Sequence, residues 1–236
     1  MEYSDFLLNI IPTLLLEILA ASAGIFYLKK VKATGSEKVF VAFLWITVFF
    51  EILGSYSGFA YFSNYTVFGF VKETPFRNNY WLSNIYILLN NLVYIYFFGT
   101  KLKNKWAKNS IAGVSVIMIL AVLIDFASSD FYTEISRVST IFGSLLVLST
   151  ILLFYLELLA SEKLLALRYD LSFYISVIIL IYTLCISPLD YLSNYFKTST
   201  GNHLFVSFRV YTLLILNILL YLTFTFAFIV CSKKKK

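Results

Sequence analysis

Seven long apolar segments fill most of this chain, and they constrain its fold more than any other feature of the sequence. Each has about the 20 residues that a helix needs to cross the hydrocarbon core of a bilayer. A chain can cross that core only when its backbone hydrogen bonds are satisfied internally, as in an α-helix. The sequence therefore predicts an all-α integral membrane protein, a bundle of seven transmembrane helices. We place the spans at about 6–28, 39–62, 80–100, 110–127, 138–160, 171–192 and 208–231.

Composition supports this prediction and leaves little room for other domains. Hydrophobic residues make up 60% of the 236 residues and charged residues 14%, whereas a soluble domain has about 25% charged residues. The connections between the spans are short, so we expect residues 1–236 to form a single membrane domain. Any signal must then leave through a protein partner. The expected location is a bacterial inner (cytoplasmic) membrane or a plasma membrane.

The distribution of lysine and arginine predicts the orientation of the bundle. If the N-terminus lies outside, 14 of the 19 basic residues fall in the inner connections and at the C-terminus. Because basic residues are enriched on the cytoplasmic side, we expect the N-terminus outside and the C-terminus inside. The net charge of +6 comes from these short runs, which suit contact with anionic lipids of the inner leaflet. Nucleic acid is not an expected partner.

Two stretches in the first two spans are almost alike. Residues 13–24 (TLLLEILAASAG) and 47–58 (TVFFEILGSYSG) each place one carboxylate, Glu17 or Glu51, within a long apolar run. Small residues follow each acid on the same helical face. The two spans are antiparallel neighbours, so packing along these small residues would bring both carboxylates together near the midplane, around a local two-fold axis.

An acid at that depth is costly, by about 2.5–3.5 kcal/mol on insertion scales, and such acids mark functional sites by default. Two neighbouring acids would not both stay ionised unless a cation lay between them. The pair therefore predicts a shared proton, a bound cation or a cationic ligand. The alternative is that each glutamate is protonated and hydrogen-bonds to Thr, Ser or Asn on another helix, as a packing element.

Polar side chains of the later spans are candidates to complete a cavity around the two acids. The predicted ligand- or cation-binding residues are Glu17, Glu51, Asn84, Asn90, Tyr94, Asn217 and Tyr221. An amide at mid-depth must find a partner, which either a ligand or another helix can supply. The two cysteines are far apart in depth and His203 is the only histidine, so we expect no metal site and no cofactor.

An internal repeat is a further prediction. Asn90 and Tyr94 in the third span share the spacing Asn-x3-Tyr with Asn217 and Tyr221 in the seventh, about 127 positions later. Residues of the first and fifth spans, and of the second and sixth, keep nearly the same offset. This pattern favours a 3+1+3 arrangement of two parallel repeats joined by the fourth span. Chance similarity in a chain rich in Leu, Phe and Tyr is the alternative.

The expected layout resembles that of rhodopsins and G-protein-coupled receptors. The 3+1+3 pattern is also similar to that of sugar and vitamin transporters built from triple-helix bundles. Retinal binding needs a lysine in the last span, and there is none between Lys197 and Lys233. Asn217 and Tyr221 copy the spacing of the receptors' Asn-Pro-x-x-Tyr motif without its proline. The resemblance is therefore one of architecture only.

Three kinds of function fit a membrane bundle with a mid-membrane acidic site. The first is a sensor or accessory module that binds a small ligand or cation and acts through an inner-face partner. The second is a proton- or cation-coupled transporter of small solutes. The third is a pore-forming or channel-like effector that acts as a homo-oligomer. An intramembrane enzyme is the least expected, because no nucleophile–base pair accompanies the acids and no catalytic residue is assigned.

Overall fold

The computed structural model describes residues 3–128, 131–161, 167–193, 195–196 and 201–233. In this part of the chain the structure consists of helices and connecting turns, without a strand. Seven of its helical segments are long and apolar enough to cross a membrane. The predicted all-helical chain with seven apolar spans is confirmed, and these spans indicate an integral membrane protein.

The helices follow the predicted spans, with small shifts at their ends. The second span is divided in two, and short 3-10 turns η1 and η2 lie in the connection after it. In chain order the elements are α1 (Tyr3–Lys30), α2 (Gly35–Gly54), α3 (Tyr56–Phe62), η1 (Gly69–Val71), η2 (Pro75–Arg77), α4 (Tyr80–Gly99), α5 (Lys105–Ser128), α6 (Arg137–Leu159), α7 (Leu171–Ser193) and α8 (His203–Cys231).

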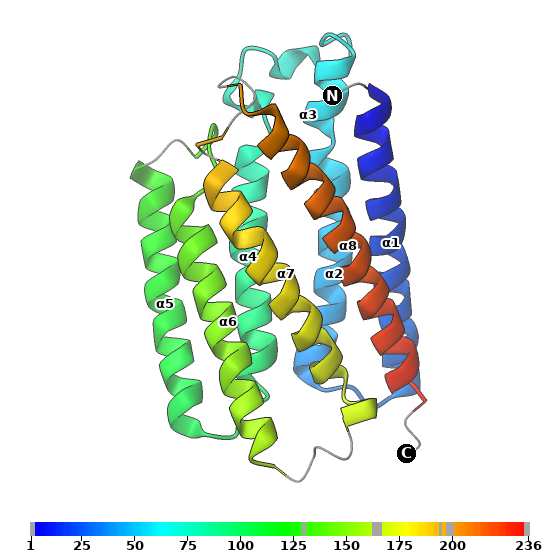
Figure 1. Ribbon diagram of the computed structural model, residues 1–236, viewed down its shortest axis with the longest axis vertical. Helices are drawn as coiled ribbons and strands as arrows, with labels where there is room; N and C mark the ends of the chain where they lie inside the picture. Colours follow the sequence, from blue (N-terminus) through cyan, green and yellow to red (C-terminus); the bar gives the residue numbers. More distant parts are fainter. Residues whose placement is uncertain (1–2, 129–130, 162–166, 194, 197–200, 234–236) are drawn as a thin grey trace.

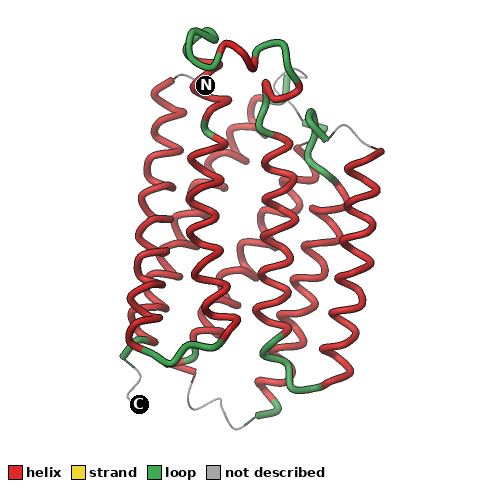
Figure 2. Tube along the Cα trace, turned by 180° about the vertical axis from the view of Figure 1, so that it is seen from behind, coloured by secondary structure: helices red, strands yellow, loops and turns green. Residues whose placement is uncertain are grey.

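Six of the spans in the described part of the chain form a closed ring. Neighbouring helices in this ring are α1, α2, α4, α6, α7 and α8, and α8 returns to α1. Helix α5 lies outside the ring against α4 and α6, at one edge of the bundle (Figure 1). The chain termini lie at opposite ends, and α3 lies at the end that carries the N-terminus (Figures 1 and 2). We call the two ends the N-terminal end and the C-terminal end.

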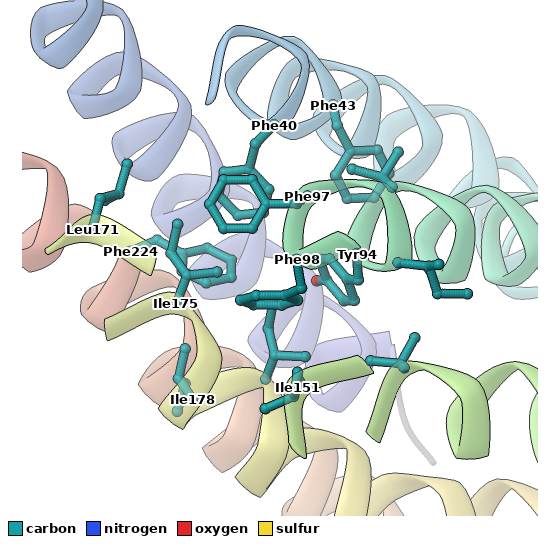
Figure 3. Packing of buried hydrophobic residues seen from close by; sticks show 14 of the residues in the cluster. Phe40, Phe43, Tyr94, Phe97, Phe98, Ile151, Leu171, Ile175, Ile178 and Phe224 are labelled. Carbon is teal, nitrogen blue, oxygen red and sulfur yellow. The ribbon is translucent and has the colours of Figure 1, made fainter. Parts of the chain in front are cut away.

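Aromatic rings fill the interior of the ring of helices. The ring centroid of Phe40 on α2 lies 5.0 Å from that of Phe97 on α4 and 5.2 Å from that of Phe224 on α8. All three side chains are fully buried, and Figure 3 shows them between the helices. Lipid tails are as apolar as these side chains, so the helices associate through close van der Waals packing.

Candidate functional site

A cavity of about 460 Å³ lies between α1, α2, α4, α7 and α8. Its lining extends from Glu17, near the middle of α1, to Phe6 and Ile10 in the first turns of that helix, and it includes residues of α3. The cavity therefore runs from the middle of the bundle toward the N-terminal end. Both Glu17 and Glu51 line it, so the two similar stretches contribute their acids to one place.

The two stretches pack against each other in a nearly symmetric way. A Cβ added to Gly24 would lie 2.9 Å from a methyl group of Val41, and one added to Gly58 would lie 2.1 Å from the ring of Phe6. The stretches are offset by 34 residues. In a fully symmetric packing, the contact of Gly24 with Val41 would therefore be repeated by a contact of Gly58 with Leu7. The observed partner, Phe6, is one residue away. The antiparallel packing thus places both glutamates, midway between these contacts, in the same cavity.

The second span has a one-residue irregularity at Ser55, one turn after Glu51. Helix α2 ends at Gly54, and Ser55 separates it from α3. The carbonyl oxygen of Gly54 accepts hydrogen bonds from Asn79 Nδ2 at 3.2 Å and from Ser57 Oγ at 3.3 Å. Gly54, Ser55 and Ser57 all line the cavity. Ser55 keeps helical dihedral angles, and its backbone N–H donates to the carbonyl oxygen of Glu51 at 3.1 Å, so α2 and α3 together form one apolar span.

Glu17 is the more deeply buried of the two acids, with 3% of its surface exposed. The hydroxyl group of Tyr221 and the carboxyl group of Glu51 are both close enough to interact with its carboxyl group electrostatically. The Oε2 atom of Glu17 has no hydrogen-bond partner in the described part of the chain. A buried acceptor without a partner is unfavourable. The site therefore offers a carboxyl oxygen to a hydrogen-bond donor in the cavity.

Tyrosine side chains surround the acids. Tyr86 on α4, Tyr182 on α7 and Tyr221 on α8 line the cavity, and all three interact electrostatically with Glu17. The hydroxyl oxygen of Tyr86 lies 3.4 Å from Thr47 Oγ1, which itself donates to the carbonyl oxygen of Phe43 at 3.2 Å. The Tyr86 hydroxyl is therefore the donor to Thr47. The carboxyl groups are thus enclosed by phenol hydroxyls and aromatic ring faces.

Four of the seven residues predicted from the sequence line this cavity, namely Glu17, Glu51, Asn217 and Tyr221. Asn90, Tyr94 and Asn84 lie outside its lining. Tyr94 is buried behind the cavity, with its ring 6.1 Å from that of Phe43 and its hydroxyl close enough to interact with that of Tyr86. Asn90 has a buried Oδ1 atom without a hydrogen-bond partner among the described residues. Ligand binding by any of the seven stays a prediction.

Asn84 has a structural environment instead. Its side-chain amide donates to the carbonyl oxygens of Phe131 at 2.9 Å and Glu134 at 3.0 Å. Its Oδ1 atom accepts from the backbone N–H of Ser136 at 2.8 Å. All three partners belong to the connection between α5 and α6. The side chain thus holds this connection against α4.

Tyr86, Tyr182 and Asn79 are among the lining residues that sequence reasoning did not select. Tyr86 lies one turn before Asn90 and two turns before Tyr94, so helical periodicity could have found it. Tyr182 has no such signal, because a tyrosine in an apolar span is usually part of packing or of an interfacial belt. Asn79 precedes α4 and donates to the carbonyl oxygen of Gly54, a contact between distant positions that the sequence alone does not predict.

A second cavity, of about 380 Å³, lies at the C-terminal end. There Glu37 Oε1 pairs with Lys101 Nζ at 3.1 Å, and Glu37 Oε2 accepts from the backbone N–H of Thr34 at 2.8 Å and from the hydroxyl of Tyr27 at 3.4 Å. These contacts connect the ends of α1 and α4 to the first turn of α2. The lining holds three lysines and three acids, so the cavity has no excess of either charge.

No protein-family model, curated protein or solved structure matches this chain. Among the described residues there is also no group of three or more His, Cys, Asp or Glu side chains that could hold a metal ion. The cavity that contains Glu17 and Glu51 is therefore the main indication of function in this chain.

Proposed function

We propose that this protein is a membrane-embedded sensor or accessory module that binds a small cationic ligand and acts through a protein partner. The observation that carries the proposal is the partnerless Oε2 atom of Glu17, which is buried in a cavity shared with Glu51. A cation in this cavity would offset the charge of the two acids and supply the missing donor. Packing alone would satisfy Glu17 from a neighbouring helix, which this structure does not do for Oε2.

We further propose that the N-terminal end faces the outside of the cell and the C-terminal end the cytoplasm. The concentration of basic residues at the C-terminal end supports this orientation, and the cavity would then receive its ligand from outside. A single cysteine at exposed Lys72 should react with a membrane-impermeant maleimide in intact cells, whereas one at exposed Lys103 should not. The reverse pattern would contradict the orientation.

The 3+1+3 arrangement belongs to the same proposal. In the first set of three spans α1 contacts α2, which contacts α4, and in the last set α6 contacts α7, which contacts α8. The remaining span, α5, lies outside the ring, as a linker between two repeats would. Both observations support two sets of helices with the same neighbour order.

A column of aromatic rings supports the proposed link between the cavity and a partner. From Tyr221 in the cavity, the column passes to Phe224, Phe40, Phe228 and Tyr27, with neighbouring ring centroids between 5.2 and 6.3 Å apart. Tyr27 then bonds to the acid at the start of α2. Close-packed side chains transmit displacement because the interior is dense, so a shift of Tyr221 on binding would reach the C-terminal end.

The second candidate function is a proton- or cation-coupled transporter of small solutes. The irregularity at Gly54 and Ser55, which lies in the cavity lining beside Glu51, favours it, because backbone carbonyl groups at irregular positions of helices contribute to the binding sites of such transporters. A transporter predicts solute uptake that depends on Glu17 and Glu51. A sensor predicts binding without uptake and a partner that co-purifies.

Native mass spectrometry of the protein extracted gently from its own host tests the binding proposal. We expect a small molecule bound to the wild-type protein and absent from the Glu17→Gln, Glu51→Gln double variant. Glu73→Gln is the matched control, because Glu73 is exposed and lies outside the cavity lining, and it should retain the ligand. Equal retention by all three proteins, or no bound small molecule in any of them, would contradict the proposal.

A further inference from the structure

The lining of the cavity around Glu17 has a single sign of charge. Glu17 and Glu51 are its acids, and its described residues include no lysine, arginine or histidine. An anionic ligand would meet two carboxyl groups at short range in a medium of low dielectric constant, where repulsion is strong. With a neutral ligand, protonation would be the only way to remove the charge of the two acids. Charge therefore favours a cationic ligand.

The donor set and the size of the cavity favour an organic cation over a metal ion. Calcium takes six to eight oxygen ligands, of which carboxylates and carbonyls are the usual sources, whereas the described residues hold no group of three or more acids or other metal ligands. The volume of about 460 Å³ lies within the range of about 300–1,000 Å³ typical of pockets for small organic molecules.

The hydrogen-bonding state of Glu17 selects among organic cations. Its Oε2 atom lies buried without a partner among the described residues, and in the carboxylate form that a bound cation favours it accepts hydrogen bonds only. A quaternary ammonium ion has no N–H group and would leave this oxygen unsatisfied. A primary or secondary ammonium group carries two or three N–H donors and can bond to Glu17 and to a second acceptor such as Glu51.

Aromatic rings beside the acids complete the recognition chemistry. Phe50 and Tyr86, with ring centroids 5.6 Å apart, line the cavity together with Tyr182 and Tyr221. Ring faces attract an ammonium group by about 0.5–2 kcal/mol, and they also pack against the hydrocarbon part of a ligand. The polar side chains of Ser55 and Asn79 also line the cavity, together with the apolar side chains of Phe6 and Ile10.

We propose that the ligand of this cavity is an organic amine, with its ammonium group bonded to Glu17 and its hydrocarbon part against the tyrosine rings. The inference rests on the proposed binding function and names the chemical class of the ligand. Glu51 supplies the second acceptor and lowers the cost of burying the positive charge. The amine enters from the N-terminal end, toward which the cavity extends.

A panel of matched probes tests the amine class on the purified full-length protein. The amines are phenethylamine, butylamine and putrescine, and the neutral isosteres are phenethyl alcohol and butanol. Benzyltrimethylammonium tests a cation without N–H donors, and sodium, potassium and calcium chlorides test inorganic cations. We expect an amine to raise the unfolding temperature and to bind in calorimetry, while its neutral isostere does not.

Variants locate the binding site. Loss of a hydrogen bond to a charged group predicts that Glu17→Gln weakens amine affinity about ten- to hundredfold. Tyr221→Phe removes a hydroxyl that lies beside Glu17 in the cavity and serves as a second variant if Glu17→Gln does not fold; we expect a smaller loss of affinity. Exposed Glu73→Gln should bind as the wild-type protein does.

The outcomes separate this inference from the proposed function. Equal binding of amines and neutral isosteres, or binding of inorganic cations alone, would overturn the proposal that the ligand is an amine. The proposed binding function of the cavity would then still stand. If no amine of the panel binds, the molecule retained in native mass spectrometry decides. A retained amine supports the inference, a retained molecule without a basic nitrogen overturns the amine class alone, and no retained molecule overturns both proposals.

Discussion

Replacing Asn84 with alanine should destabilise the protein without abolishing ligand binding. Asn84 is 1% exposed, and its side chain makes three hydrogen bonds to the backbone of the connection between α5 and α6. Such a bond contributes about 0.6 kcal/mol within a bilayer and about 1 kcal/mol in water. Loss of all three therefore predicts a decrease of about 2–3 kcal/mol in the free energy of unfolding.

The decrease can be measured by titrating the protein from a mild detergent into sodium dodecyl sulfate and following tryptophan fluorescence. Asn217→Ala is the matched control, because Asn217 lines the cavity and its side chain has no hydrogen bond to another described residue. We expect a stability change within about 0.5 kcal/mol for this control and a loss of ligand affinity that Asn84→Ala does not show. Equal stability losses in the two variants, or lost binding at unchanged stability in Asn84→Ala, would refute the structural role of Asn84.

Two further changes test contacts between helices. Gly143→Ala should cost about 1–3 kcal/mol of stability by overpacking, because its Cβ would lie 2.0 Å from Asn91 Nδ2 and displace the bond of Asn91 to the carbonyl oxygen of Ser139. Adding Asn91→Ala should recover part of this loss in the same unfolding assay, and strictly additive effects would count against the contact. Lys101→Met should lower stability by about 1–3 kcal/mol, since Glu37 is largely buried and loses its 3.1 Å partner. Adding Glu37→Gln should restore most of that stability. If Lys101→Met alone were as stable as the wild-type protein, the pair would not hold α2 against α4.

The seven spans could be predicted because their signal is contained within each segment. A run of about 20 apolar residues is long enough to cross a bilayer, whatever its neighbours are. The irregularity at Ser55 could not be predicted, since serine and glycine are common inside membrane helices. There the side chain of Asn79, 25 residues later along the chain, donates to the carbonyl oxygen of Gly54. Tertiary contacts of this kind have no local sequence signal.

The candidate site could be predicted only in part, because only some of its residues have a signal within their own segment. Glu17 and Glu51 stand out because a carboxylate in an apolar span is rare and costly, and their similar surroundings indicated that they pack together. An asparagine in a span is less informative, because helices, loops and ligands satisfy its amide equally well. Asn84 bonds to a connecting loop and Asn217 lines the cavity. In the sequence each is simply an asparagine within an apolar span.

A density map of the protein purified from its own host, at a resolution that shows side chains and bound molecules, tests the central claim most directly. The account predicts non-protein density within hydrogen-bonding distance of Glu17 Oε2, between α1, α2 and the rings of Tyr86 and Tyr221, and its loss in Glu17→Gln. A cavity closed by side chains, with both carboxyl oxygens of Glu17 bonded to neighbouring helices, would contradict it and leave the two glutamates as packing elements.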